Sequence, residues 1–168
     1  NVKMNEGTRF LSPFLNISNE KTFSKYFTIQ MNKEGIDLDE RDVKRAAGLA
    51  YKALAEYKSD VEKEGERIIE KAEKENIPLV VLVGRPYHVD SEINHGIDTL
   101  LTSLGVAIIT EDSVSRKEEK FRTMVLNQWT YHSRLYGAAK WVRDRKDNRT
   151  VLIHLVSFGC GVDAITGD

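Results

Sequence analysis

A short apolar run near the middle of the chain constrains the fold more than any other feature. Residues 77–83 read IPLVVLV, and Gly84, Arg85 and Pro86 follow at once. A continuous apolar stretch of this length, rich in Val, is typical of a β-strand buried on both faces. Such strands occur in parallel sheets that carry helices on both sides. The run therefore predicts an α/β architecture.

Two further strands are predicted after this one, over residues 106–110 and 150–156. A helix capped by Asp90 or Ser91 precedes the first of them, with an apolar stripe between Ile93 and Leu104. Before the last strand we expect two helical stretches, with apolar positions at Phe121, Met124 and Val125 and then at Leu135, Ala138, Ala139 and Val142. Alternating strands and helices indicate a Rossmann-like parallel sheet with right-handed crossovers.

The first 76 residues have a helical pattern instead. A helix capped by Ser18 or Asn19 should end near Gly35, and a second should begin around residues 37–39. Residues 62–75 are mostly Glu and Lys, which is typical of a solvated helix face, and Gly65 allows a break or kink there. We therefore divide the chain into a helical N-terminal part, residues 1–76, and a Rossmann-like α/β part, residues 77–168.

Composition excludes several classes of function. The 168 residues include 25 basic and 26 acidic side chains, so the chain lacks the basic excess of a nucleic-acid binder. Its longest apolar run is far shorter than the roughly 20 residues that a membrane-spanning helix needs. A single cysteine cannot form an internal disulfide, nor can it hold a zinc ion or an iron–sulfur cluster alone. These features predict a cytoplasmic protein with no nucleic-acid or membrane partner.

The two ends of the sequence suggest that it is part of a longer protein. The first residue is Asn1, and the last residues follow directly on a strand-and-turn pattern. A helix normally covers a buried strand of this kind, so we expect further chain beyond it.

Chemistry is expected where the strands end, because open parallel sheets bind ligands at the carboxyl edge. Three loops reach this edge, at residues 84–94, 111–115 and 157–163. The first loop lacks both glycine patterns of the standard nucleotide sites. Arg85 in that loop could hold an anion, although an Arg that forks to neighbouring carboxylates is the commoner arrangement.

Histidines and the single cysteine supply the other candidates at this edge. His88, His95, His132 and Cys160 could form a mixed metal site only if the fold brings all four together. Otherwise each histidine bonds to its own loop or caps a helix, and His154 packs in the core. Cys160 lies between two glycines that leave room around its sulfur for a ligand, cluster or partner. It is therefore either a functional thiol, a cluster ligand or a packed structural residue.

At these residues the sequence resembles the acyl-CoA dehydratase activase-related family, also described as 2-hydroxyglutaryl-CoA dehydratase activator-related proteins. The resemblance is specific over residues 78–164. It is carried by four blocks, VLVGRPYHVD with EINHGI, LGV with TEDSV, QWTYHSRLY, and LVSFGCGVDA. Before residue 78 it is looser and depends on Leu11, Ser12, Pro13 and the helical pattern.

This resemblance implies a segment of a large multidomain protein of anaerobic metabolism. Related systems use ATP hydrolysis to drive an electron through iron–sulfur clusters into the dehydration of a 2-hydroxyacyl-CoA. The segment would belong to the dehydratase-like region, with acyl-CoA and other domains of the parent protein as partners. Cys160 would be one cluster ligand in the full-length protein, and the isolated segment would hold no cluster. The family blocks also contain further candidates for the ligand or substrate site, namely Arg85, His88, Asn94, His95, His132 and Arg134.

Two other functions stay open at this stage. The chain could be a non-catalytic scaffold or interaction module, in which case Arg85, His88, His132 and Cys160 should lie apart. It could also be an autonomous hydrolase that uses Cys160 as its nucleophile, which requires a histidine within hydrogen-bond reach of the thiol.

Overall fold

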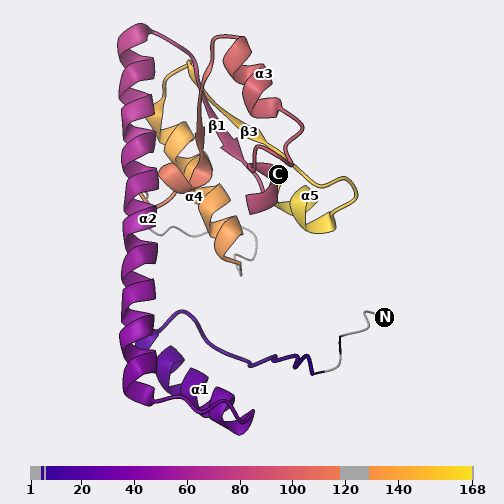
Figure 1. Cartoon of the computed structure of the whole chain (residues 1–168). Helices are drawn as coiled ribbons and strands as arrows, with labels where there is room; N and C mark the ends of the chain where they lie inside the picture. The colour runs from indigo at the N-terminus through magenta and orange to yellow at the C-terminus, as the bar shows by residue number, and fades with distance from the viewer. Residues whose placement is uncertain (1–4, 6, 118–128, 168) are drawn as a thin grey trace. The chain divides into compact units, whose positions relative to one another are not determined.

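The computed structural model describes residues 5, 7–117 and 129–167 (Figure 1). Its contacts divide the chain into two compact units, Asn1–Tyr57 and Lys58–Asp168, which we call the helical unit and the α/β unit. Helix α2, Glu40–Glu75, contributes residues to both. The domain boundary predicted at residue 76 stays a prediction. The helix predicted around Phe121, Met124 and Val125 lies outside the described residues.

The helical unit begins its regular structure at α1, Glu20–Lys33. Asn19 caps this helix, because its side chain accepts the backbone N–H of Thr22 at 3.1 Å, as one of the two predicted caps. Gly35 follows the last turn with a φ of 73°, a left-handed conformation that favours glycine. Tyr51 of α2 donates its hydroxyl to the Ile17 carbonyl at 2.6 Å and so holds the segment before α1.

The α/β unit is built on a three-stranded parallel sheet in the order β2-β1-β3. The strands are β1, Leu79–Val83, β2, Ala107–Thr110, and β3, Thr150–His154. Short 3₁₀ turns follow β1 and β2, at η1, Pro86–His88, and η2, Glu111–Ser113. The helices are α3, Ile97–Ser103, α4, Thr130–Arg145, and α5, Gly161–Gly167. The structure confirms the predicted α/β class, with a parallel sheet flanked by helices and a helical N-terminal part.

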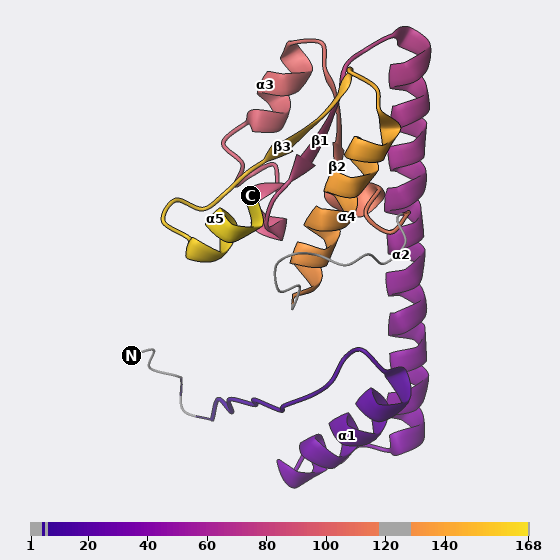
Figure 2. The same ribbon diagram turned by 180° about the vertical axis from the view of Figure 1, so that it is seen from behind.

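The core lies between the sheet and two helices. All five residues of β1 are buried, as the apolar run predicts. Leu79, Val81 and Val83 join one cluster with Ile69 of α2 and Leu135 of α4. Figures 1 and 2 show these two helices on one side of the sheet and α3 on the other. Each fully buried side chain of this size contributes about 1.5–3 kcal/mol, so this layer positions the sheet edges firmly.

The helix after β1 starts later than predicted. The expected cap at Asp90 or Ser91 is wrong, because α3 begins only at Ile97. The carboxylate of Asp90 accepts the N–H of Glu92, and the side-chain amide oxygen of Asn94 accepts the N–H of Gly96. Such local bonds compete with a helix. Left-handed backbone at His95 and Gly96 then separates these turns from α3.

Helix α2 continues through Gly65, so the break that the sequence allowed there does not occur. The missing side chain provides room for η2 instead. A Cβ at residue 65 would lie 2.5 Å from the Cβ of Ser113 in η2. Ion pairs from α2 flank this contact, with Glu62 and Arg116 at 2.6 Å and Glu66 and Lys117 at 3.0 Å. The glycine therefore fixes how closely η2 approaches α2 within the α/β unit.

We predict that Gly65→Ala destabilises the protein although alanine favours a helix. The helix propensity gain of up to about 1 kcal/mol should be outweighed by the clash with Ser113, because overpacking costs about 1–3 kcal/mol. Gly48→Ala in the same helix is the control, since its Cβ would meet only the flexible end of Glu20 at 3.2 Å. Urea unfolding should show a lower free energy of unfolding for Gly65→Ala, and a higher or unchanged one for Gly48→Ala. Equal gains would contradict the packing role.

Candidate functional site

The carboxyl ends of β1 and β3 lie side by side and form the candidate site. Val83 and His154 pair at the end of the ladder between these strands. The chain runs from β1 outward to β2 and then returns across β1 to β3. The β1/β3 edge is therefore the point where the strand order reverses, and open α/β sheets bind their ligands in the crevice at such a point.

Arg85 connects the two loops at this edge. Its Nε and Nη2 donate to the Asp163 carboxylate at 3.2 and 3.0 Å, and Nη2 also donates to the Cys160 sulfur at 2.7 Å. Burial alone would raise the pKa of Asp163, but bonds from the Ser157 N–H and from Arg85 outweigh it and lower this pKa. The hydrogen bond to Asp163 raises the pKa of Arg85. Both groups are therefore charged, and Arg85, held by Asp163, bonds to the thiol.

A second set of bonds surrounds Ser157. The Ser157 hydroxyl lies 3.2 Å from His88 Nε2 and 3.1 Å from the Tyr87 hydroxyl. His88 Nδ1 accepts the backbone N–H of Arg85 at 3.3 Å. A neutral His88 therefore carries its proton on Nε2 and donates it to Ser157. In this arrangement His88 orients Ser157 and does not act as a base toward it.

The first turn of α4 borders the same cluster. The Arg85 guanidinium lies over the ring of Tyr131, 5.6 Å from its centre. Tyr131 packs against His132 with ring centres 3.9 Å apart, and His132 stacks on Trp129 at 5.2 Å. His132 is only 4% exposed, and burial lowers its pKa. Its Nε2 and the Tyr131 hydroxyl have no hydrogen-bond partner among the described residues.

A buried ion pair lies after β2, where Glu111 is 2% exposed and its Oε1 is 3.2 Å from Arg134 of α4. Desolvation raises the pKa of Glu111 to about 7, although Arg134 opposes this shift. The second carboxylate oxygen, Oε2, and Arg134 Nε have no partner within the described part of the chain. This carboxyl group can therefore exchange a proton near neutral pH.

The structure brings some of the predicted site residues together and leaves others apart. Arg85, His88 and Cys160 belong to one hydrogen-bonded cluster, to which His132 connects through Tyr131. The remaining three lie outside this cluster: Arg134 pairs with Glu111, Asn94 is buried in its own turn, and His95 is exposed.

The scaffold hypothesis expected Arg85, His88, His132 and Cys160 to lie apart, whereas the structure brings them close together. The scaffold hypothesis itself stays a prediction. The hydrolase hypothesis needs a histidine bonded to the thiol. Among the described residues the bond to Cys160 comes from Arg85, and no histidine bonds to its sulfur.

Sequence reasoning missed three important residues, Asp163, Tyr131 and Glu111. Asp163 and Glu111 fell inside the predicted loops, and a carboxylate that directly follows a buried strand was the available signal for Glu111. No three His, Cys, Asp or Glu side chains in the described part of the chain are grouped so that they could hold a metal ion. None of the helices described is long and apolar enough to cross a membrane.

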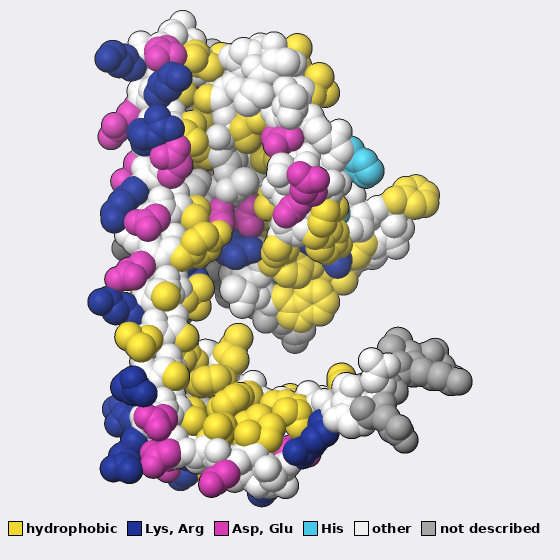
Figure 3. Space-filling model, viewed as in Figure 1, with side chains coloured by type: hydrophobic (Ala, Val, Ile, Leu, Met, Phe, Trp, Pro, Cys, Tyr) yellow, Lys and Arg dark blue, Asp and Glu magenta, His cyan; other side chains and the backbone are white. Residues whose placement is uncertain are grey.

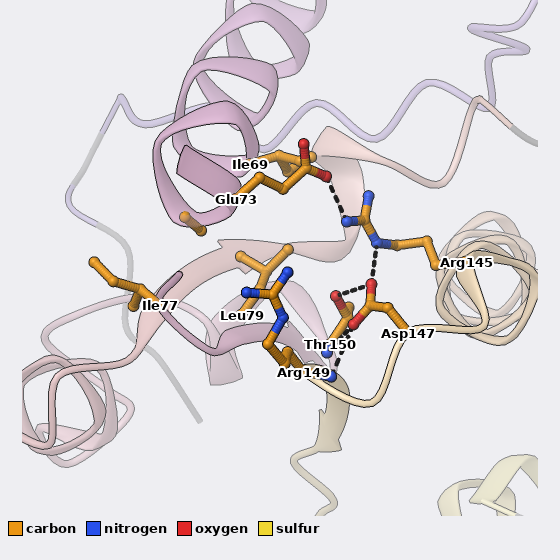
Figure 4. Close-up of a pocket in the computed structure, with 9 residues that line it drawn as sticks. Ile69, Glu73, Ile77, Leu79, Arg145, Asp147, Arg149 and Thr150 are labelled. Atoms are coloured by element: carbon orange, nitrogen blue, oxygen red, sulfur yellow. Dashed lines mark hydrogen bonds and ion pairs between the residues drawn. The ribbon is translucent and has the colours of Figure 1, made fainter. Parts of the chain in front are cut away.

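A pocket lies at the opposite, amino edge of the sheet, and four of its polar residues, Glu73, Arg145, Asp147 and Thr150, bond to one another (Figure 4). Arg145 bonds to Glu73 at 2.6 Å and to Asp147 at 2.9 Å, and Asp147 also accepts the Thr150 hydroxyl at 2.8 Å. Burial would raise the pKa of Asp147, but bonds from Arg145, Thr150 and backbone N–H groups lower it strongly. This satisfied network is structural, because it joins α2, α4 and β3.

Comparison with known proteins gives one match. A family model described as "CoA enzyme activase uncharacterised domain" matches residues 1–114. This range covers the helical residues, where the resemblance to activase-related proteins was loose, and it continues through β1 and β2. Helix α4, strand β3 and Cys160 follow the matched range. No curated protein and no solved structure matches the chain.

We predict that Asp147→Asn lowers the free energy of unfolding by about 1–3 kcal/mol at pH 7, because a bonded carboxylate is lost. The pKa of Asp147 is lowered from 3.8 in the folded state. Its charge therefore stabilises the protein above pH 3.8, and this contribution disappears as the pH falls through the lower folded-state value. Urea unfolding at several pH values should show that the difference in free energy of unfolding between Asp147→Asn and the native protein becomes smaller below pH 3.8. Asp144→Asn, at an exposed ion pair of α4, should have little effect.

Glu111→Gln should show the opposite pH dependence. The pKa of Glu111 is raised from 4.5 to about 7 in the folded state. The native protein therefore loses stability as the pH rises from 4.5 to about 7, because the unfolded chain releases this proton first. Glutamine has no proton to lose. The free energy of unfolding of the variant should therefore rise, relative to that of the native protein, by up to about 3 kcal/mol across this interval. If the difference in free energy of unfolding between the two proteins does not change between pH 4.5 and about pH 8, the raised pKa of Glu111 is contradicted.

Proposed function

The chain belongs to the family of the CoA enzyme activase uncharacterised domain, and we propose that it supplies one thiolate ligand, Cys160, to an iron–sulfur cluster. In this proposal it is a cytoplasmic segment of a 2-hydroxyacyl-CoA dehydratase activase-related protein. The cluster, when bound, would supply one-electron transfer for ATP-driven reduction of an acyl-CoA. The observation that carries the proposal is the Arg85–Cys160 contact at the β1/β3 edge.

The surroundings of Cys160 suit a cluster ligand in three respects. The thiol is half-buried, at an edge where ligands of open sheets bind. Added Cβ atoms at Gly159 and Gly161 would meet nothing within 4 Å, so the backbone on both sides of Cys160 is open. Arg85 donates an N–H to the sulfur, and such bonds tune the potentials of thiolate-bound clusters.

The donor set of the chain is nevertheless incomplete. Cys160 is its one cysteine, whereas a cluster needs thiolates or histidines at several positions. The remaining ligands must therefore come from other domains or from a partner protein. In this proposal Asp163 and Ser157 position Arg85 and so the thiol, and the isolated chain binds no cluster.

Exposed apolar side chains favour a second candidate function, an interaction module. Phe10, Phe14 and Ile17 in the helical unit are 74%, 96% and 72% exposed, and apolar side chains gather on this unit (Figure 3). Exposed apolar surface of this kind marks sites of protein contact. The interaction function and the cluster function can coexist, since the partner could supply the missing ligands.

We predict that Cys160→Ala lowers the iron content of the full-length protein after anaerobic reconstitution and changes the cluster's absorption and electron paramagnetic resonance spectra. Arg85→Lys is the matched control, because it keeps a positive charge beside Asp163 but loses the planar fork that reaches the sulfur. This variant should keep its iron while the reduction potential falls, since an N–H donor to the sulfur stabilises the reduced state. Unchanged iron content and spectra in Cys160→Ala would exclude Cys160 as a ligand and favour the interaction module.

A further inference from the structure

We propose that the N-terminus of α4 binds an anionic group, a carboxylate or a phosphate, carried by the molecule that occupies the β1/β3 edge. The anion would accept backbone N–H groups of the first turn and the Nε2–H of His132. The proposal deepens the proposed function, on which it depends for the identity of the ligand and for placing the anion near a cluster ligand. Its physical basis is independent of Cys160.

The first observation is a helix end that the described side chains do not neutralise. Helix α4 is 16 residues long, its N-cap Trp129 makes no side-chain cap, and its first turn contains no acidic residue. In contrast, α1 has the cap Asn19 and an acidic first turn at Glu20. The free N–H groups and the dipole at such an end attract an anion.

The second observation is the buried imidazole in the same turn. His132 is 4% exposed, and its Nε2 has no partner among the described residues. Helical side chains lean toward the N-terminus, and the His132 ring stacks on that of Trp129 at the cap, so it lies at the helix end. A buried nitrogen without a partner needs explanation in a native protein. An anion bound at the turn would provide that partner.

The charges around this turn also favour an anion. Arg85 places its guanidinium over Tyr131, beside the same turn. The nearby carboxylate of Asp163 does not oppose an anion strongly, because it is already bonded to Arg85 and to the Ser157 N–H. Glu111, after β2, is paired with Arg134. Asp163 and Glu111, the two buried carboxylates at this edge, are thus each paired with an arginine.

This placement would orient the ligand relative to the thiol. Arg85 contacts both the Cys160 sulfur and the Tyr131 ring. An anionic group held by the first turn of α4 would therefore lie near Arg85, the residue that bonds to the thiol. Both a carboxylate of the acyl chain and a phosphate of the CoA part present the required oxygens. The test must therefore distinguish these two sources.

The experiment titrates the isotope-labelled chain with inorganic phosphate and, separately, with acetate, at constant ionic strength set by chloride. Backbone amide resonances of residues 130–132 should shift and saturate with at least one of the two. Tighter binding of phosphate would indicate the CoA part, and tighter binding of acetate would indicate the acyl chain. If neither anion gives saturable shifts at millimolar concentrations, the proposal is wrong.

Thr130→Asp provides the sharpest variant, because it places a carboxylate of the chain itself in the first turn. Thr130 is exposed, so the variant should fold and keep or raise its melting temperature, since acidic residues stabilise helix N-termini. The affinity for the anion should fall about tenfold or more. Thr130→Asn is the neutral control and should keep its affinity within about twofold. Equal affinities in the two variants would overturn the proposal.

His132→Phe tests the imidazole separately, because it keeps an aromatic ring in the stack but removes both nitrogens. Anion affinity should fall, whereas the shifts of α1 amides should stay unaffected. An unchanged affinity would remove His132 from the subsite. Iron content of the full-length protein does not report on this subsite, so failure here and failure of the cluster proposal are distinguishable.

Discussion

The ion pair between Arg85 and Asp163 is the interaction on which the candidate site depends. It joins the loop after β1 to the first turn of α5, across 78 residues of sequence, and it lies directly beyond the paired ends of β1 and β3. Asp163 is 3% exposed in its side chain, and a buried carboxylate without a partner would be strongly destabilising. Any rearrangement that takes Arg85 away would therefore leave the buried Asp163 carboxylate without its charged partner. The same guanidinium contacts the Cys160 sulfur, so the position of the thiol follows from the ion pair.

The two edges of the sheet differ in how their polar groups are satisfied. At the amino edge Asp147 bonds to Arg145 and Thr150, and each of these groups has a partner within the pocket. At the carboxyl edge His132, Tyr131 and Glu111 keep buried polar atoms without partners among the described residues. Natural proteins leave buried polar atoms without hydrogen-bond partners mainly at functional sites. The contrast therefore supports function at the carboxyl edge, although the pocket is found at the other one.

The sequence predicted those features that depend on local pattern. Strand β1 was recognisable because five apolar residues in a row can be buried on both faces, and Cys160 stood out because glycines flank it. The start of α3 was predicted wrongly because Asp90 and Asn94 bond to nearby backbone, which no periodicity reveals. Asp163 was missed because its partner lies in another loop. Gly65 was interpreted as a possible break because the contact with Ser113 exists only in the folded unit.

Helix α4 shows how one element can serve both stability and function. Leu135 and Ala138, in its middle, belong to the buried core, and Gly137 lies so close to the Ser115 carbonyl that a Cβ would be 2.5 Å from it. These contacts fix the helix against the sheet and η2. Because the middle of the helix is packed in this way, its first turn is held at the carboxyl edge, where Tyr131 and His132 keep buried polar atoms without partners among the described residues. The stability of the core thus compensates for the unsatisfied polar groups of the site, which is the relation expected where binding requires preorganised donors.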